Sequence, residues 1–251
     1  MTDGALVLDE VKEPFHSFGC RERLDQVGAS TVGEPTYPDQ DADSREECNV
    51  NSDSAVAPRY ALSFTTGGLL ERESAVLAPV YIEHRDWAKV RDIAVEENLL
   101  QTRTHSTGVR RVRETVKRMS ALFDHEIEIF SDITATERGH LMWVAACRRY
   151  ELIGEFAEEV LRERFLTLAG TVAYEDYDSF YRAKAMWHDE LGAVSDLSYK
   201  KLRQVLFKMV VEAGLLTAKG AIEPVLPTAH VADCLNQRTP SDIRFFPTRV
   251  V

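Results

Sequence analysis

The chain has 251 residues and a formal net charge of −11, with 44% hydrophobic and 28% charged residues, which are ordinary proportions for a globular protein. Its length suffices for one large domain or two small ones, and no apolar run approaches the roughly 20 residues that span a bilayer. An acidic total of this size argues against nucleic-acid binding, unless the charge is unevenly distributed.

The acidity is concentrated near the N-terminus. Residues 1–57 hold 13 acidic and 4 basic residues, a net charge of −9, whereas the remainder holds 28 acidic and 26 basic residues. Residues 28–53 are rich in Gly, Ser, Thr, Pro, Asp and Glu and cannot bury enough apolar surface to offset the entropy lost on ordering. We therefore expect residues 1–57 to form a disordered acidic tail before a nearly neutral body.

The cysteines and the N-terminus indicate the compartment. No two cysteines form a CxxC motif, so we expect free thiols in a reducing environment. The first residues lack the basic start of a signal peptide. The sequence thus predicts a cytoplasmic protein without a membrane segment. The cysteines are Cys20, Cys48, Cys147 and Cys234.

Helical spacing of apolar residues begins after Gly67-Gly68, where the first helix is predicted. Asp86 is placed to cap a second helix. A third helix is expected to start around Ser106 or Thr107, after a short link. This order gives a helix-turn-helix-like element.

The pattern continues with a capping box, Thr134-x-x-Glu137, before a fourth helix that Gly154 is placed to break. Helical periodicity then runs on to about Leu168. Core packing is the default interpretation of the three tryptophans, which are Trp87, Trp143 and Trp187.

A further helix is predicted with Asp178 as its cap. Ser195 or Ser198 caps the last long helix, and Gly214 is placed to end it. The core side of this last helix comprises Leu202, Val205, Leu206, Met209, Val210 and Ala213.

Two short extended pieces around a turn at Gly220 follow that helix and complete a winged-helix order. The sequence therefore predicts a mainly α fold, a compact helical protein with helix-turn-helix-like and winged-helix-like parts. We divide it into a tail at 1–57, a helical region at 58–168, a winged-helix-like region at 169–234 and an irregular tail at 235–251.

A basic helix is the clearest chemical feature. Between residues 99 and 120 lie six basic residues and one acidic residue, Glu114. A helix with one buried face and one basic face suits phosphate neutralisation, although a solvated surface helix has the same pattern. The expected phosphate contacts on this helix are Arg103, Arg110, Arg111, Arg113 and Lys117; the sixth basic residue is Arg118.

The last long helix carries a second basic group in its early turns, where a recognition helix approaches DNA. A packing helix without a ligand explains the spacing equally well. The expected contacts are Lys200, Lys201, Arg203 and Lys208.

Enzyme motifs are missing from the sequence. It has no glycine-rich phosphate loop, no GxSxG elbow, no HExxH and no metal-ligand spacing among its seven histidines. We therefore expect no catalytic residues, no metal and no cofactor.

From Tyr60 to about Ala232 the chain resembles the BrxA family of BREX bacteriophage-defence systems. Many separate blocks carry this resemblance in order. They include Tyr60-Ala-Leu-Ser-Phe-Thr-Thr-Gly-Gly-Leu-Leu-x-x-Glu73, Asp86-Trp87, Asn98-Leu-Leu-Gln101-x-Arg103-Thr-x-Ser106, Trp143-x-Ala-x-Cys-Arg-x-Tyr150 and Lys201-Leu-Arg-Gln-Val-Leu-Phe207.

The resemblance implies a compact all-α, non-catalytic component that binds double-stranded DNA and works with other BREX proteins. It also implies similarity to the helical antitermination factor NusB, which makes RNA an alternative ligand. The competing interpretation is an assembly adaptor whose basic faces dock acidic partner proteins. The acidic tail has no counterpart in the family pattern, and we hypothesise that it competes with DNA for the basic helix.

Overall fold

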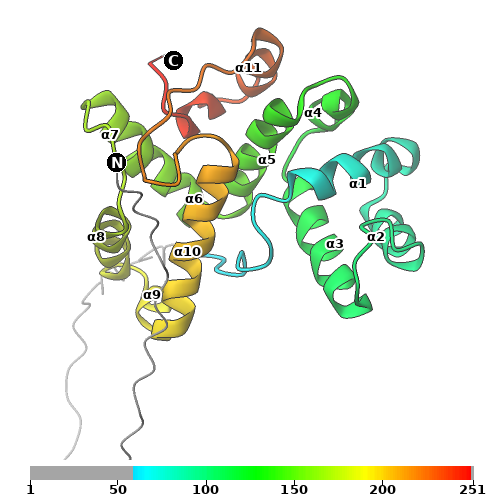
Figure 1. The fold of residues 1–251 in the computed structure, drawn as a ribbon, viewed down its shortest axis with the longest axis horizontal. Coiled ribbons are helices and arrows are strands. Elements are labelled where there is room, and N and C mark those ends of the chain that lie inside the picture. Colours follow the sequence, from blue (N-terminus) through cyan, green and yellow to red (C-terminus); the bar gives the residue numbers. More distant parts are fainter. Residues whose placement is uncertain (1–58, 250–251) are drawn as a thin grey trace, which may run out of the picture. The chain divides into compact units, whose positions relative to one another are not determined.

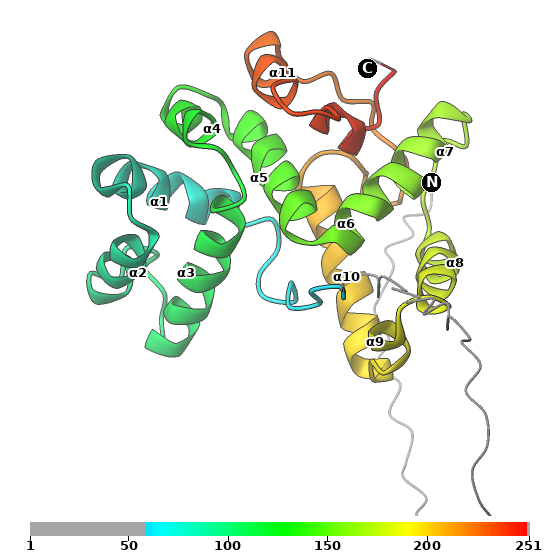
Figure 2. The ribbon, with the colours of Figure 1, turned by 180° about the vertical axis from the view of Figure 1, so that it is seen from behind.

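The computed structural model describes residues 59–249, and most of this part is helical (Figures 1 and 2). Its only extended pairings among those residues are isolated bridges, which confirms the mainly α fold. The acidic tail expected at residues 1–57 lies outside the described residues. None of the described helices is both long and apolar enough to cross a membrane.

The first three helices pack against one another, and they are α1 (Glu71–His84), α2 (Trp87–Glu96) and α3 (His105–Met119). Asp86 caps α2 as predicted, because its carboxylate accepts a 2.7 Å hydrogen bond from the backbone N–H of Ala88. Helix α3 begins one residue earlier than predicted, with Thr104 as its cap.

Helix α5 (Ala135–Arg149) is the most buried element; it follows the short helices α4 (Asp124–Glu128) and η1 (Ile129–Ser131). The predicted capping box is formed by Thr134 and Glu137. The residues of α5 that the protein buries are Gly139, His140, Leu141, Met142, Trp143, Val144, Ala145, Ala146 and Cys147.

The helical path after α5 breaks at Tyr150 and not at Gly154, which corrects the prediction. Gly154 lies inside α6 (Glu151–Phe156), where a Cβ atom would stand 3.0 Å from the carbonyl oxygen of Cys147. A close backbone approach, and not a helix end, therefore requires this glycine. The path continues through a π-helical turn, η2 (Ala157–Arg162), and α7 (Glu163–Leu166).

Helix α8 (Tyr174–Ala185) corrects a second prediction. It starts four residues before Asp178, and the carboxylate of Asp176 accepts a 2.7 Å hydrogen bond from the N–H of Ala173 at its start. Trp187 follows the helix and is 81% exposed, so core packing is wrong for this tryptophan.

The last long helix agrees with the sequence prediction. It is α10 (Asp196–Glu212), which follows the short α9 (Asp189–Gly192). Ser195 caps it, and Gly214 follows it with a φ of +73°. All six predicted core residues of α10 and its end are buried.

The predicted wing is not a pair of strands. Isolated bridges join Leu216 to Ile222 and Thr171 to Ala221, so three pieces of chain meet around the turn at Gly220. The winged-helix-like and helix-turn-helix-like interpretations remain predictions.

The C-terminal segment is more ordered than the sequence suggests, since α11 (Ala229–Leu235) and the short η3 (Asp242–Phe245) are unpredicted. The indole N–H of Trp143 donates a 2.9 Å hydrogen bond to the carbonyl of Phe245. Phe246 is fully buried. Residues after Leu235 therefore close the core.

Candidate nucleic-acid interface

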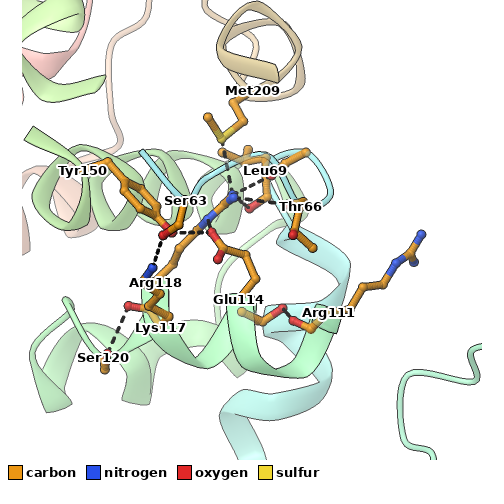
Figure 3. Close-up of polar contacts among 12 residues, drawn as sticks. Ser63, Thr66, Leu69, Arg111, Glu114, Lys117, Arg118, Ser120, Tyr150 and Met209 are labelled. Atoms are coloured by element: carbon orange, nitrogen blue, oxygen red, sulfur yellow. Dashed lines mark hydrogen bonds and ion pairs between the residues drawn. The ribbon is translucent and has the colours of Figure 1, made fainter. Parts of the chain in front are cut away.

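The inner side of α3 is fixed by a buried ion pair, which Figure 3 shows. The Nε of Arg118 lies 2.9 Å from a carboxylate oxygen of Glu114, and the same oxygen accepts a 2.6 Å hydrogen bond from the hydroxyl of Tyr150. The guanidinium also donates to the carbonyl of Gly68 and contacts the sulfur of Met209. This pair connects α3 with three other segments of the chain.

Arg118 therefore does not belong to the basic surface. Its side chain has no exposed area, although the sequence groups it with the other cations of the helix. Burial and the hydrogen bond to Glu114 raise the pKa of Tyr150, so its hydroxyl keeps the proton that it donates. The charge left to face solvent on α3 comes from the other basic residues.

Arg103, Arg110 and Arg113 are the freest of these. All three are exposed and have neither an ion pair nor a side-chain hydrogen bond among the described residues. Arg110 and Arg113 are three residues apart, and thus lie on the same side of α3. Together they present uncompensated charge to solvent.

Arg111 and Lys117 have partners. Arg111 lies 3.1 Å from the carboxylate of Glu73 but remains 45% exposed. Lys117 is half-buried, donates to the hydroxyl of Ser63, and lies 5.1 Å from the ring centre of Tyr150. Burial, followed by the charge of a nearby arginine, lowers the pKa of Lys117. These two residues contribute less free charge than the sequence suggests.

The first half of α3 is the part that extends into solvent. Residues 105–107 and the cap, Thr104, are exposed, whereas the buried residues of the helix start at Val112. The unpaired N–H groups and the dipole at a helix start attract anions. The helix-turn-helix-like interpretation of α2, the link and this end of α3 remains a prediction.

Helix α10 divides its predicted contacts into two kinds. Lys200 and Lys201 are exposed, and Lys208, 54% exposed, lies 3.6 Å from Glu212. Arg203 instead makes two hydrogen bonds, 2.6 and 2.7 Å long, to the carboxylate of Asp178. This guanidinium holds α8 against α10.

A groove of about 740 Å³ lies beside α10, and its residues include two that the sequence analysis missed. Lys219, from the turn after α10, and Tyr174, the first residue of α8, line it together with Lys201 and Lys208. Only the folded chain brings Tyr174 to these lysines, so spacing along the sequence gives no signal for it.

A second basic pocket, of about 450 Å³, was also missed. Arg59, Arg149 and Arg238 line it, and they come from three distant parts of the sequence. Acidic side chains share the pocket, among them Glu151 and Glu155. Its charge is therefore more balanced than that of the free arginines on α3.

Comparisons with known proteins agree on one family. The model of the BrxA family matches residues 58–239. A protein named BREX protein BrxA from Bacillus cereus (strain H3081.97) is 24% identical over 144 residues, which cover 57% of this chain and 72% of the relative. A protein of the same name from Escherichia coli O9:H4 (strain HS) is 24% identical over 148 residues, covering 59% of this chain and 70% of the relative.

A solved structure has the same fold. It is the crystal structure of an uncharacterized protein from Magnetospirillum magneticum, with a TM-score of 0.66 and 20% identity. The match covers 76% of this chain and all of that one.

Proposed function

The chain belongs to the BrxA family, and from that premise we propose that it is a non-catalytic component of a BREX phage-defence system that binds double-stranded DNA. Its DNA contacts are the phosphates, and its partners are other proteins of the system. The proposal places the protein in the cytoplasm, where the DNA and these partners are.

The observation that carries the proposal is the unpaired charge on α3. Arg110 and Arg113 are exposed and have no partner within residues 59–249, and the opposite side of the helix is held by the buried pair of Glu114 and Arg118. A rigid helix with free guanidinium groups can neutralise phosphates and release their counterions without rearranging. Arg103, just before the helix, extends the same charge.

The second helix supplies further phosphate contacts through Lys200, Lys201 and Lys208. Arg203 is assigned a supporting role, because Asp178 already binds its guanidinium. The set offers cations but no defined pair of groups for reading base edges. Binding is therefore tolerant of DNA sequence.

The test is fluorescence anisotropy with two labelled 20-base-pair duplexes of unrelated sequence, over a series of salt concentrations. We expect similar affinities for both duplexes and a linear fall of log affinity with log salt. A weak interaction that salt does not change would contradict the proposal. An RNA duplex of the same length, measured in parallel, tests the NusB-like alternative.

A specific observation favours a second function, that of an assembly adaptor. Three large apolar side chains between the end of α8 and the start of α10 are exposed, Met186 at 77%, Trp187 at 81% and Leu197 at 82%. Exposed tryptophan and methionine side chains are typical of protein interfaces. Replacing Trp187 by Ser should abolish co-purification with another BREX protein while DNA affinity stays unchanged. If the variant still co-purified as the wild type does, this second function would be ruled out.

A further inference from the structure

The groove between α10 and the turn at residues 217–220 combines cations with aromatic rings. Its cations are Lys201, Lys208 and Lys219, and its aromatic residues are Tyr174 and Phe207. At about 740 Å³ it has the size of a site for a small molecule or a few nucleotides, and not of a duplex.

Two neighbouring side chains hold Tyr174 in place. The guanidinium of Arg203 lies over its ring, 4.5 Å from the ring centre, and Asp178 fixes that guanidinium with two hydrogen bonds. Phe207 meets the same ring edge-on at 4.7 Å. Arg203 does not line the groove, and Tyr174 is 45% exposed, so part of its ring faces open space.

The opposite rim is held by the backbone of the turn. Gly220 has a φ of +81°, and its N–H donates a 2.9 Å hydrogen bond to the carbonyl of Thr217. Its own carbonyl accepts a 2.8 Å bond from the N–H of Val172. These bonds fix the backbone next to Lys219 against Val172, two residues before Tyr174.

The groove is also electropositive. Its one acidic lining residue is Glu212, whose carboxylate accepts a 2.6 Å hydrogen bond from the N–H of Leu69 and lies 3.6 Å from Lys208. Glu212 therefore offsets part of the charge of Lys208. Lys201 and Lys219 have no acidic partner among residues 59–249.

We propose that this groove binds a single strand of nucleic acid, with one unpaired base stacked on Tyr174 and the adjacent phosphates next to Lys201 and Lys219. Aromatic stacking beside a cationic track is the chemistry of single-strand recognition. A base inside a duplex is already stacked on both faces and cannot reach the ring. The inference extends the proposed function, since it rests on the chain binding nucleic acid; it uses a different surface from α3 and shares Lys201 and Lys208 with the duplex contacts proposed on α10.

The first experiment is photo-crosslinking of the full-length protein to a 15-nucleotide single strand of thymidines in which 5-iododeoxyuridine replaces one base. This base forms a covalent bond with an aromatic side chain stacked on it, so mass spectrometry should place the crosslink on Tyr174. A crosslink only at other residues would overturn the inference.

The second experiment compares the affinities of three proteins for the same strand and for a 15-base-pair duplex. We expect Tyr174→Ala to bind the single strand about tenfold more weakly, and Tyr174→Phe to bind it as the wild type does, because the phenylalanine ring still stacks. Both variants should keep the affinity of the wild type for the duplex. Thermal melting verifies that both variants are folded.

The outcomes separate the two proposals. Binding of the duplex without the single strand would overturn this inference and leave the proposed function intact. Binding of neither would overturn both. An equal loss of both affinities in Tyr174→Ala would show a general effect on the surface and contradict a stacking site.

Discussion

The guanidinium of Arg118 lies 2.9 Å from the carboxylate of Glu114, with 0% and 7% of the two side chains exposed. The pair is formed within a single helix, one turn apart, yet each partner also binds a group elsewhere in the chain. Arg118 donates a hydrogen bond to the carbonyl of Gly68, and the carboxylate of Glu114 accepts one from the hydroxyl of Tyr150. A local ion pair thus positions α3 relative to the rest of the protein.

Breaking this pair should be costly. Arg118→Ala leaves the carboxylate of Glu114 buried without its cation, and we expect the free energy of unfolding to fall by about 3–5 kcal/mol. Urea denaturation followed by circular dichroism measures this. Arg111→Ala on the same helix is the matched control. The side chain of Arg111 is 45% exposed, so its ion pair with Glu73 should contribute at most about 1 kcal/mol to the free energy of unfolding. Similar losses in both variants would contradict the role given to Arg118.

Removing free charge from α3 should change the salt dependence of DNA binding. Each phosphate contact contributes about 0.9 to the slope of log affinity against log salt, so the double variant Arg110→Ala, Arg113→Ala should reduce that slope by about 1.8. The anisotropy titration measures it. The control is Lys89→Ala with Arg182→Ala, an equal change of charge at exposed positions on α2 and α8. An equal reduction there would mean that net charge, and not α3, determines binding.

His140 should make stability depend on pH. Burial lowers the pKa of its imidazole, and the charge of Glu137 offsets this only in part. The unfolded chain takes up this proton at a higher pH than the folded protein, so the contribution to stability falls as the pH drops below about 6.5. Urea denaturation measures the free energy of unfolding at pH 7 and at pH 5. The difference between the two values should be smaller for His140→Gln than for the wild type. His105→Gln, at an exposed position, should behave like the wild type.

The cap of α2 offers a test of local structure. Asp86→Ala removes the acceptor for the first N–H groups of the helix and should reduce the free energy of unfolding by about 1 kcal/mol. Asp86→Ser, which keeps a side-chain oxygen, should restore most of it. Thermal melting of the two variants side by side distinguishes a lost cap from a lost negative charge. Equal melting points for Ala and Ser would contradict the capping role.

The acidic segment at residues 1–57 should weaken DNA binding. It carries a net charge of −9, and its deletion removes competition for the cations of the body. We expect tighter DNA binding at low salt and little change at high salt. The control is the same deletion in the Arg110→Ala, Arg113→Ala double variant. The gain in DNA affinity should be smaller there. An unchanged affinity in the first comparison would remove the hypothesis.

Much of the fold could be predicted because its signals are local. The caps at Asp86, Thr134 and Ser195 bind backbone groups within three residues, so the pattern that predicts them is also the interaction that forms. The apolar spacing of α10 is likewise read over a few turns. By contrast, Asp178 looks like a cap and is a partner of Arg203, 25 residues away.

The candidate site was harder to predict for the same reason. Sequence gives the sign of a charge but not its exposure, so Arg118 and Arg110 look equivalent on paper although only Arg110 faces solvent. Tyr174 and Lys219 line the same groove because a bridge pairs Thr171 with Ala221. These two residues are 50 positions apart in the sequence, so no local pattern predicts their contact. The two basic helices could be predicted from the sequence. Which of their basic residues face solvent, and which are buried or paired, could not.

The hydrogen bond from Trp143 to Phe245 has a consequence for synthesis of the protein. Trp143 is at the centre of α5, and its partner lies 102 residues later in the chain. Arg148 of the same helix also depends on a late residue, because its guanidinium lies 2.7 Å from the fully buried carboxylate of Asp242. As the ribosome releases the chain, α5 emerges after α1 and α3, which pack against it, but long before the C-terminal residues that complete its cover. The side of α5 that binds residues 242–246 therefore stays uncovered, and open to aggregation, until those residues have left the exit tunnel.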